Sequence, residues 1–342
     1  MLGKTAGGLF WMFRYLERSE NTARLIEAGF RIALTRADGD DDEWGSVLQT
    51  AAVAHLYYQK HETLEAAKAI DFLLRDATNP SSVLSAISAA RMNARLVRTA
   101  ITREVWEAVN DTYMILKQAL ARPVSARDLP EVLALIRQQS ALVRGAMHGT
   151  MLRNDIFDFC RLGTFLERAD NTARILDVKY YVLLPSISQI GSSLDNVQWE
   201  TILRSVAGQR AYRWITQGET SPMGIADFLI FDGRMPRSLA FSVGKIATNL
   251  GYLERAYSQR HPCHDRIDVL SARLTHGTIE RVFEDGLHEF ITDFLADVAR
   301  RPAGRDRLPV PGIGDPSCTS ESCTPRPTIS TSRSPTDCSA CA

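Results

Sequence analysis

The chain has 342 residues, which is long enough to bury a substantial core as one large domain or two smaller ones. Its 40 Lys and Arg residues balance 40 Asp and Glu residues, so no overall charge favours a nucleic acid or an anionic membrane as partner. No stretch reaches the roughly 18 apolar residues of a spanning helix, and the apolar run 9–13 is too short for a signal peptide. We therefore expect a cytoplasmic protein that does not enter the membrane.

Helix-forming residues dominate the chain up to residue 301, and no convincing alternation of apolar with polar residues predicts a strand. Breaks between the predicted helices fall at Pro residues and at polar turns such as the acidic segment 38–42. The sequence thus predicts an all-α helical bundle. In chain order, the predicted helices span residues 9–34, 44–59, 61–75, 79–121, 128–148, 155–184, 195–208, 211–216, 223–231, 236–260, 265–274 and 278–301.

From residue 302 onward the composition changes to Pro, Ser, Thr, Arg and Cys, with few large apolar residues. Such a segment cannot bury enough apolar surface to offset its ordering entropy, so we predict a disordered tail over residues 302–342. Cys318, Cys323, Cys338 and Cys341 have the spacing of zinc ligands, but no helix or strand is predicted around them. We expect neither a metal nor a cofactor in this chain.

The segment 15–27, with the sequence Tyr-Leu-Glu-Arg-Ser-Glu-Asn-Thr-Ala-Arg-Leu-Ile-Glu, recurs as segment 165–177. The second copy is Phe-Leu-Glu-Arg-Ala-Asp-Asn-Thr-Ala-Arg-Ile-Leu-Asp, in which seven of thirteen positions are identical and the others are similar. Because internal repeats determine the architecture of a chain, this match is the strongest feature of the sequence.

Two further blocks repeat in the same order. Residues 44–52 match residues 199–207, and residues 71–83 match residues 227–239, at offsets of 155 and 156. Three blocks in one order with nearly one offset indicate an ancient tandem doubling. We predict a single helical domain over residues 1–301. Its two pseudo-repeats, 1–150 and 151–301, are expected to be related by a pseudo-two-fold axis.

Each copy of the repeated segment carries a polar stripe of the form Glu-Arg-x-x-Asn-x-x-Arg. On a helical wheel, aromatic and apolar side chains lie among these charges, so each stripe faces protein or a cleft rather than bulk solvent. We expect the two stripes to meet at the pseudo-two-fold axis. The stripes and the Arg that precedes the first comprise Arg14, Glu17, Arg18, Asn21 and Arg24, with Glu167, Arg168, Asn171 and Arg174 in the second copy.

Two interpretations of the stripes stay open. In one, the charges pair with each other and fix how the two halves dock. In the other, they line a pocket for an anionic or zwitterionic ligand, because Arg offers a planar fork for carboxylate or phosphate. Glu17 and Glu167 are then the candidates for general acid or base. A di-iron centre of the helix-bundle kind is excluded, because it requires Glu-x-x-His and the matching positions are Glu20 and Asp170.

Further ligand candidates lie outside the stripes. Arg91, Asn93 and Arg95 belong to a segment without a clear counterpart in the second half, and asymmetry in a doubled chain is where specialisation is expected. The alternative is a solvated helix face with charge pairs four residues apart. Arg237 belongs to the predicted helix start Pro236-Arg237-Ser238, where free backbone amides attract anions.

The chain resembles the bacterial alpha-E family, whose all-helical members are named for a Glu-Arg motif. The resemblance rests on the duplicated Leu-Glu-Arg helices, the Trp-x-x-x-Leu blocks, the segment Ala-Arg-Met-Asn-Ala-Arg at 90–95 and Pro-Arg-Ser-Leu at 236–239. It covers residues 1 to about 300. The Glu-Arg motif corresponds here to Glu17-Arg18 and Glu167-Arg168.

Alpha-E proteins are typically encoded beside, or fused to, a circularly permuted ATP-grasp protein, often together with a transglutaminase-like protein. The resemblance therefore implies an accessory helical subunit of an amide or peptide ligase system, which binds the ligase, its peptide product or both. One alternative is an enzyme that acts on a peptide or amino-acid-like ligand in a Glu/Arg-lined pocket. The other is a dimerisation scaffold without a ligand. We leave open whether the chain forms a homo-oligomer.

Overall fold

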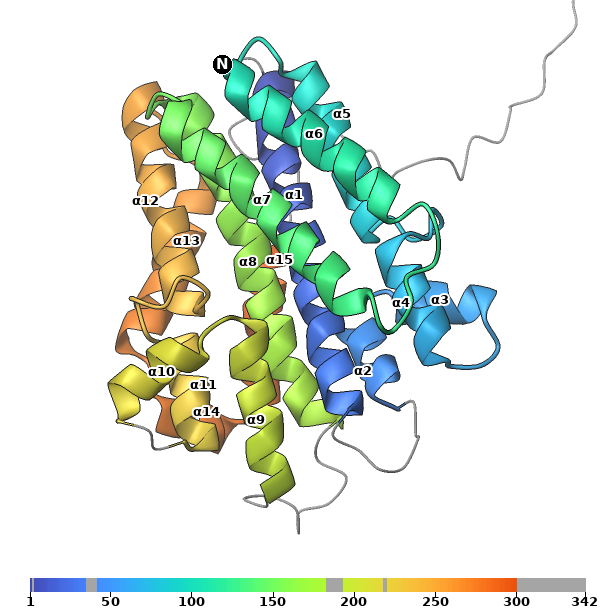
Figure 1. The fold of residues 1–342 in the computed structure, drawn as a ribbon. Helices are drawn as coiled ribbons and strands as arrows, with labels where there is room; N and C mark the ends of the chain where they lie inside the picture. The colour runs from blue at the N-terminus through green and yellow to red at the C-terminus, as the bar shows by residue number, and fades with distance from the viewer. Residues whose placement is uncertain (2, 35–41, 183–192, 218–219, 300–342) are drawn as a thin grey trace, which may run out of the picture.

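The computed structural model describes residues 1, 3–34, 42–182, 193–217 and 220–299, and every regular element in these ranges is a helix (Figure 1). The predicted all-α class is confirmed, whereas the predicted tail at 302–342 lies outside the described residues. No helix among them is long and apolar enough to cross a bilayer. The helices are α1 (Gly3–Ala33), α2 (Asp42–Thr50), α3 (Ala54–Lys60), α4 (Ala66–Leu74), α5 (Val83–Leu96), α6 (Arg103–Ala119), α7 (Leu129–Thr150), α8 (Asp155–Val182), α9 (Ser193–Ser205), α10 (Gln209–Thr216), α11 (Pro222–Ile230), α12 (Leu239–Tyr257), α13 (Pro262–His276), α14 (Ile279–Asp285) and α15 (Leu287–Ala299).

Helices α1 and α8 contact each other along the middle of the bundle (Figure 1). Helices α5 and α7 pack on α1, while α12 and α15 pack on α8. Helix α6 covers α5 and α7, and α13 covers α12. The two helices that carry the Glu-Arg stripes are therefore the central pair of the bundle.

Gly163 allows the backbone of α8 to approach the backbone of α1. A Cβ at this position would lie 2.2 Å from the carbonyl oxygen of Phe10 and 3.2 Å from the amide nitrogen of Arg14. Gly163 precedes the second copy of the repeated segment by two residues, and the matching position before the first copy is Phe13, whose ring is buried in the core. The difference between the two copies therefore has a steric cause, because only glycine fits where the two backbones touch.

Three of the predicted helices are interrupted in the structure. The predicted helix 79–121 is divided into α5 and α6 because the side chain of Thr102 caps α6, accepting a hydrogen bond from the amide of Val105. The predicted helix 278–301 breaks at Gly286, whose φ of 102° suits glycine alone. The predicted helix 44–59 breaks at Ala52, whose φ is 56°. An alanine gives no sequence signal for such a turn.

The chain follows the same path after α2 and after α9. Ala52 and Ala207 both have a φ of 56°. In both turns the amide of the next residue donates to the carbonyl five residues earlier, at 3.0 and 2.7 Å, which is the Schellman arrangement of a helix end. Likewise, Ser82 and Ser238 cap α5 and α12 by accepting hydrogen bonds from the amides three residues later.

Replacing Gly163 with Ala is expected to lower the free energy of unfolding by about 2–3 kcal/mol, because the added methyl group meets backbone atoms that cannot rotate away. Urea denaturation measures this change. Gly244→Ala in α12 is the matched control, since a Cβ there has no atom within 4 Å. That variant should be stabilised by about 0.5–1 kcal/mol through helix propensity. Equal effects of the two substitutions would contradict the close approach of α1 and α8.

Candidate functional site

The two Glu-Arg stripes meet between α1 and α8 in a pair of crossed salt bridges. Arg168 Nε and Nη2 donate to Glu17 Oε1 and Oε2 at 2.9 and 3.0 Å. In the opposite direction, Arg18 Nε and Nη2 donate to Glu167 Oε1 and Oε2 at 2.6 and 3.1 Å. Each Glu-Arg dipeptide thus makes a bidentate pair with the other, which is the strongest geometry that these side chains offer.

Further arginines surround the same carboxylates. Arg14 Nε donates to Glu167 Oε2 at 2.8 Å. Arg237, which immediately precedes the capping residue of α12, donates to Glu17 Oε1 at 3.1 Å. Arg144 of α7 lies 3.4 Å from Glu17 Oε2. Glu17 and Glu167 are only 1% and 5% exposed, so their charges are neutralised by arginines rather than by water.

Glu20, one helical turn after Glu17, extends this network and is fully buried. Its Oε1 accepts hydrogen bonds from Arg24 Nε at 3.0 Å and from Arg237 Nη2 at 2.5 Å. Its Oε2 forms an ion pair with Arg144 but receives no well-directed hydrogen bond. Since α7, α8 and the segment before α12 all send arginines to Glu17 and Glu20, one short stretch of α1 positions three other elements.

The arginines keep these carboxylates ionised. Burial alone would raise the pKa of Glu167, but the charges of Arg18 and Arg14 outweigh it and lower that pKa to about 2. The pKa of Glu17 is lowered in the same way, with burial opposed by Arg168 and Arg237. Burial lowers the pKa of Arg237 to about 10, although Glu17 partly offsets that effect. A carboxyl group that holds no proton near neutral pH cannot act as a general acid.

The remaining stripe residues have more local roles. Asn21 Oδ1 accepts a hydrogen bond from Arg237 Nη1 at 3.1 Å, while Arg24 Nη1 donates to the carbonyl oxygen of Ser205 at 3.2 Å. Arg174 Nε donates to Asp170 Oδ2 at 2.8 Å within α8. Asn171 is buried beside them. The expectation that the stripes lie together is met by the crossed pairs, and a ligand role for these residues stays a prediction.

Arg91, Asn93 and Arg95 lie apart from this network. The carbonyl of Asn93 faces Gly8, which precedes Glu17 by nine residues, or about 13 Å along α1. Arg91 Nε donates to Asn110 Oδ1 at 2.9 Å. The Asn93 side chain bonds back to the carbonyl of Ala89, and Arg95 is exposed. The predicted candidates therefore fall into two separate regions of the bundle.

Sequence reasoning did not include Glu20 or Arg144 among the site residues. Arg144 lies outside the repeated blocks, so no internal comparison marked it. A usable signal was its spacing of seven residues from Arg137, which places both arginines on one face of α7. In the structure Arg137 pairs with Glu27, further along α1. Glu27 and Glu20 thus both bind arginines of that face.

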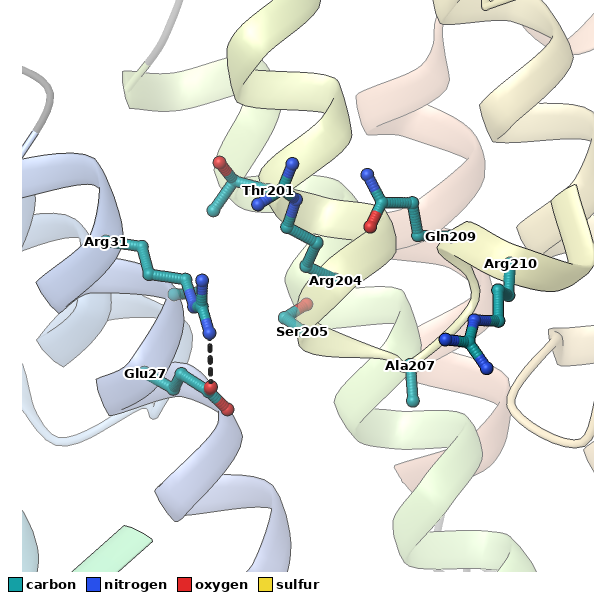
Figure 2. Close-up of a pocket in the computed structure, with 9 residues that line it drawn as sticks. Glu27, Arg31, Thr201, Arg204, Ser205, Ala207, Gln209 and Arg210 are labelled. Atoms are coloured by element: carbon teal, nitrogen blue, oxygen red, sulfur yellow. Dashed lines mark hydrogen bonds and ion pairs between the residues drawn. The ribbon is translucent and has the colours of Figure 1, made fainter. Parts of the chain in front are cut away.

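A cavity of about 330 Å³ lies between the C-terminal half of α1 and the junction of α9 with α10 (Figure 2). None of the predicted site residues lines it. No group of three or more His, Cys, Asp or Glu side chains in the described ranges could hold a metal ion. The residues lining the cavity are Glu27, Ala28, Arg31, Thr201, Arg204, Ser205, Ala207, Gln209 and Arg210.

A family model named Alpha-E, described as a predicted alpha-helical domain with a conserved ER motif, matches residues 1–301. An uncharacterized protein of Mycobacterium bovis is 23% identical over 312 residues, which cover 85% of this chain and 34% of that protein. Uncharacterized proteins of two Mycobacterium tuberculosis strains match at 23% and 22% identity with the same coverage. The chain thus spans about a third of the length of these curated relatives. No solved structure gives a significant match.

Replacing Glu17 with Gln is expected to lower the free energy of unfolding by about 3–5 kcal/mol, because Arg168 would keep a buried charge without its carboxylate partner and Arg237 would keep only Glu20. Urea denaturation of both proteins measures the difference. Glu107→Gln, which removes half of the exposed pair with Arg103, is the control and should leave stability unchanged. A Glu17 variant as stable as the parent would show that the network does not hold the helices together.

Glu167 should make stability depend on pH in the acidic range. Its pKa falls from an ordinary value of 4.5 to about 2 in the folded protein, so the unfolded chain takes up its proton first. The stability from Glu167 is therefore complete above about pH 5 and is lost as the pH falls toward 2. Urea midpoints between these limits should fall less steeply for Glu167→Gln than for the parent. Equal slopes would contradict the shift.

Proposed function

The chain belongs to the Alpha-E family, and on this premise we propose that it is an accessory helical subunit of an amide or peptide ligase system. Its proposed partner is a circularly permuted ATP-grasp protein, as the family resemblance implies, with a transglutaminase-like protein as a further candidate. The subunit binds the ligase, its peptide product or both.

One observation carries this proposal. The match covers only 34% of the curated relatives, so in those proteins the helical domain is joined to about twice its own length of further chain. Covalent joining keeps two modules at a high effective concentration, which favours modules that act on each other. A helical domain that works beside a second protein fits this arrangement.

The state of the buried carboxylates favours a binding role over an enzymatic one. Glu17 and Glu167, the candidate general acids or bases, are saturated by bidentate arginines and closed off from solvent. A base in that state would have to break two charge-assisted hydrogen bonds before it could take a proton. These groups are better suited to holding helices in place than to turning over a substrate.

We further propose that units 1–150 and 151–301 arose by tandem doubling. The crossed pairs support it, because Glu17 binds Arg168 while Glu167 binds Arg18. The matching left-handed turns at Ala52 and Ala207 are a second support, since alanine rarely adopts that conformation. A relative that consists of one such unit would test the idea. As an isolated unit it should dimerise through the same pairs.

The exposed face of α5 is the proposed contact for the ligase. Met92 and Leu96 are 60% and 76% exposed and lie one helical turn apart. Arg95 is exposed between them, and Arg91 stacks over the Tyr113 ring at 4.7 Å. Exposed apolar side chains beside arginines are typical of the centres of protein interfaces. This segment is also the one without a clear counterpart in the second half.

We expect this chain to copurify with a coexpressed circularly permuted ATP-grasp protein. Leu96→Glu should weaken that association at least tenfold, because a charge replaces an apolar contact at the interface. Val269→Glu on α13 is the matched control, since Val269 is 72% exposed elsewhere, and it should bind normally. Failure of the parent chain to associate with the ligase under any nucleotide condition would refute the proposed function.

A further inference from the structure

The cavity at the end of α1 has walls from parts of the chain far apart in sequence (Figure 2). Glu27, Ala28 and Arg31 line it from α1, and the end of α9 with the start of α10 lines the other side. The left-handed turn at Ala207 folds α10 back so that Arg210 faces the same space as Arg204. A volume of about 330 Å³ is within the range of small-molecule sites.

The charges around this cavity do not balance. Arg31, Arg204 and Arg210 line it, against the single carboxylate of Glu27. That carboxylate is already engaged by Arg31 at 3.1 Å and by Arg137 from outside the cavity. Three guanidinium groups around one cavity create a positive potential. An anion bound among them would be attracted by all three charges.

The arginines that line the cavity have N–H groups left to donate hydrogen bonds to such an anion. Arg31 and Arg204 each use one nitrogen in a surface salt bridge, Arg204 with Glu200 at 3.2 Å, and each guanidinium carries five N–H groups. Arg210 has no ion-pair partner among the side chains that the structure describes. Helix α10 begins at Gln209 and lacks a side-chain cap, so the amides of its first turn have no acceptor within the helix.

An apolar recess adjoins the charged cavity. The two share Ala28, Thr201 and Ser205. The recess adds mostly apolar walls, among them Leu25 and Ile202, and also the buried Glu43. Its volume is about 50 Å³, and one water-sized group needs roughly 10–15 Å³ on this scale. The recess therefore has room for a short aliphatic group and not for an aromatic ring.

We propose that this cavity binds a small ligand in which a carboxylate or phosphate group lies next to a short aliphatic group. The anion is held by the three arginines, and the aliphatic part enters the recess beside Leu25. In Figure 1, α9 and α10 lie at the end of the bundle opposite the N-terminal end of α1 and the α5–α6 turn. The cavity is therefore separate from the face of α5 on which a ligase is proposed to dock.

Titration calorimetry with three probes tests this inference on the full chain. N-acetylvaline and butyl phosphate each carry an anionic group and an aliphatic chain, whereas N-acetylvalinamide lacks the charge. We expect at least one anionic probe to bind at millimolar concentration or below, with affinity falling as salt rises, and the amide not to bind. The tighter of the two anions identifies carboxylate or phosphate as the natural group.

Substitutions of cavity residues test whether the anionic probes bind in this cavity. Arg204→Gln and Arg210→Gln should each weaken the anionic probe about tenfold or more, because each removes a charged hydrogen-bond donor. Both side chains are exposed, so both variants should fold normally. Arg103→Gln, an exposed helical arginine on α6, is the matched control and should bind like the parent. Ala28→Leu fills the cavity and should abolish binding.

Three results would overturn the inference: neither anionic probe binds, the amide binds as well as N-acetylvaline, or both arginine variants retain full affinity. The copurification experiment does not depend on any of them. If no probe binds but the ligase still associates, only the proposed ligand site is rejected. If the probes bind but the ligase does not associate, only the proposed partner is rejected.

Discussion

The crossed salt bridges between α1 and α8 are the constraint on which the rest of the bundle depends. Glu17 and Glu167 lie deep between the two central helices, where an ionised carboxylate is tolerated only if arginines satisfy it. Apolar side chains could fill the same space in several registers, but a bidentate pair fits only one. Because Arg144 and Arg237 bring α7 and the start of α12 to the same carboxylates, this one register positions four helices.

The network carries more positive than negative charge. Three buried carboxylates, Glu17, Glu20 and Glu167, are met by six arginines: Arg14, Arg18, Arg24, Arg144, Arg168 and Arg237. This surplus explains why the carboxyl pKa values are low. The pKa of Arg237 is lowered chiefly by burial, and the neighbouring charges of Arg168 and Arg24 lower it further. Arg24 reaches from this network to the carbonyl of Ser205, a residue that lines the cavity. Fixed charge inside the bundle therefore reinforces the positive potential of the cavity.

The sequence allowed the helical class, the central role of the repeated segments and the contact between the stripes to be predicted. Those features follow from helical periodicity and from internal repetition, and both can be recognised in the sequence alone. Arg144 was missed because a partner from an unrepeated helix is a property of packing. Arg237 was expected at a helix start that attracts anions; its side chain is buried and donates to the carboxylate of Glu17, and a ligand role for it stays a prediction. The cavity could not be predicted, because the turn at Ala207 has no Gly or Pro at the left-handed position to announce it.

The proposed doubling explains why the cavity is found on one side of the bundle. At the offset of 155, Arg204 and Arg210 occupy the positions of Gln49 and His55 in the first half. The left-handed turn is the same in both halves. Under the proposed doubling, each half therefore began with the same backbone at the position of the cavity. The side chains differ: the second half places two fixed positive charges where the first has a neutral amide and a histidine. A duplicated scaffold keeps the buried salt bridges that hold its halves together, and it is free to diverge where those salt bridges do not reach. The arginines of the cavity lie just beyond the network, where a substitution changes binding without unfolding the core.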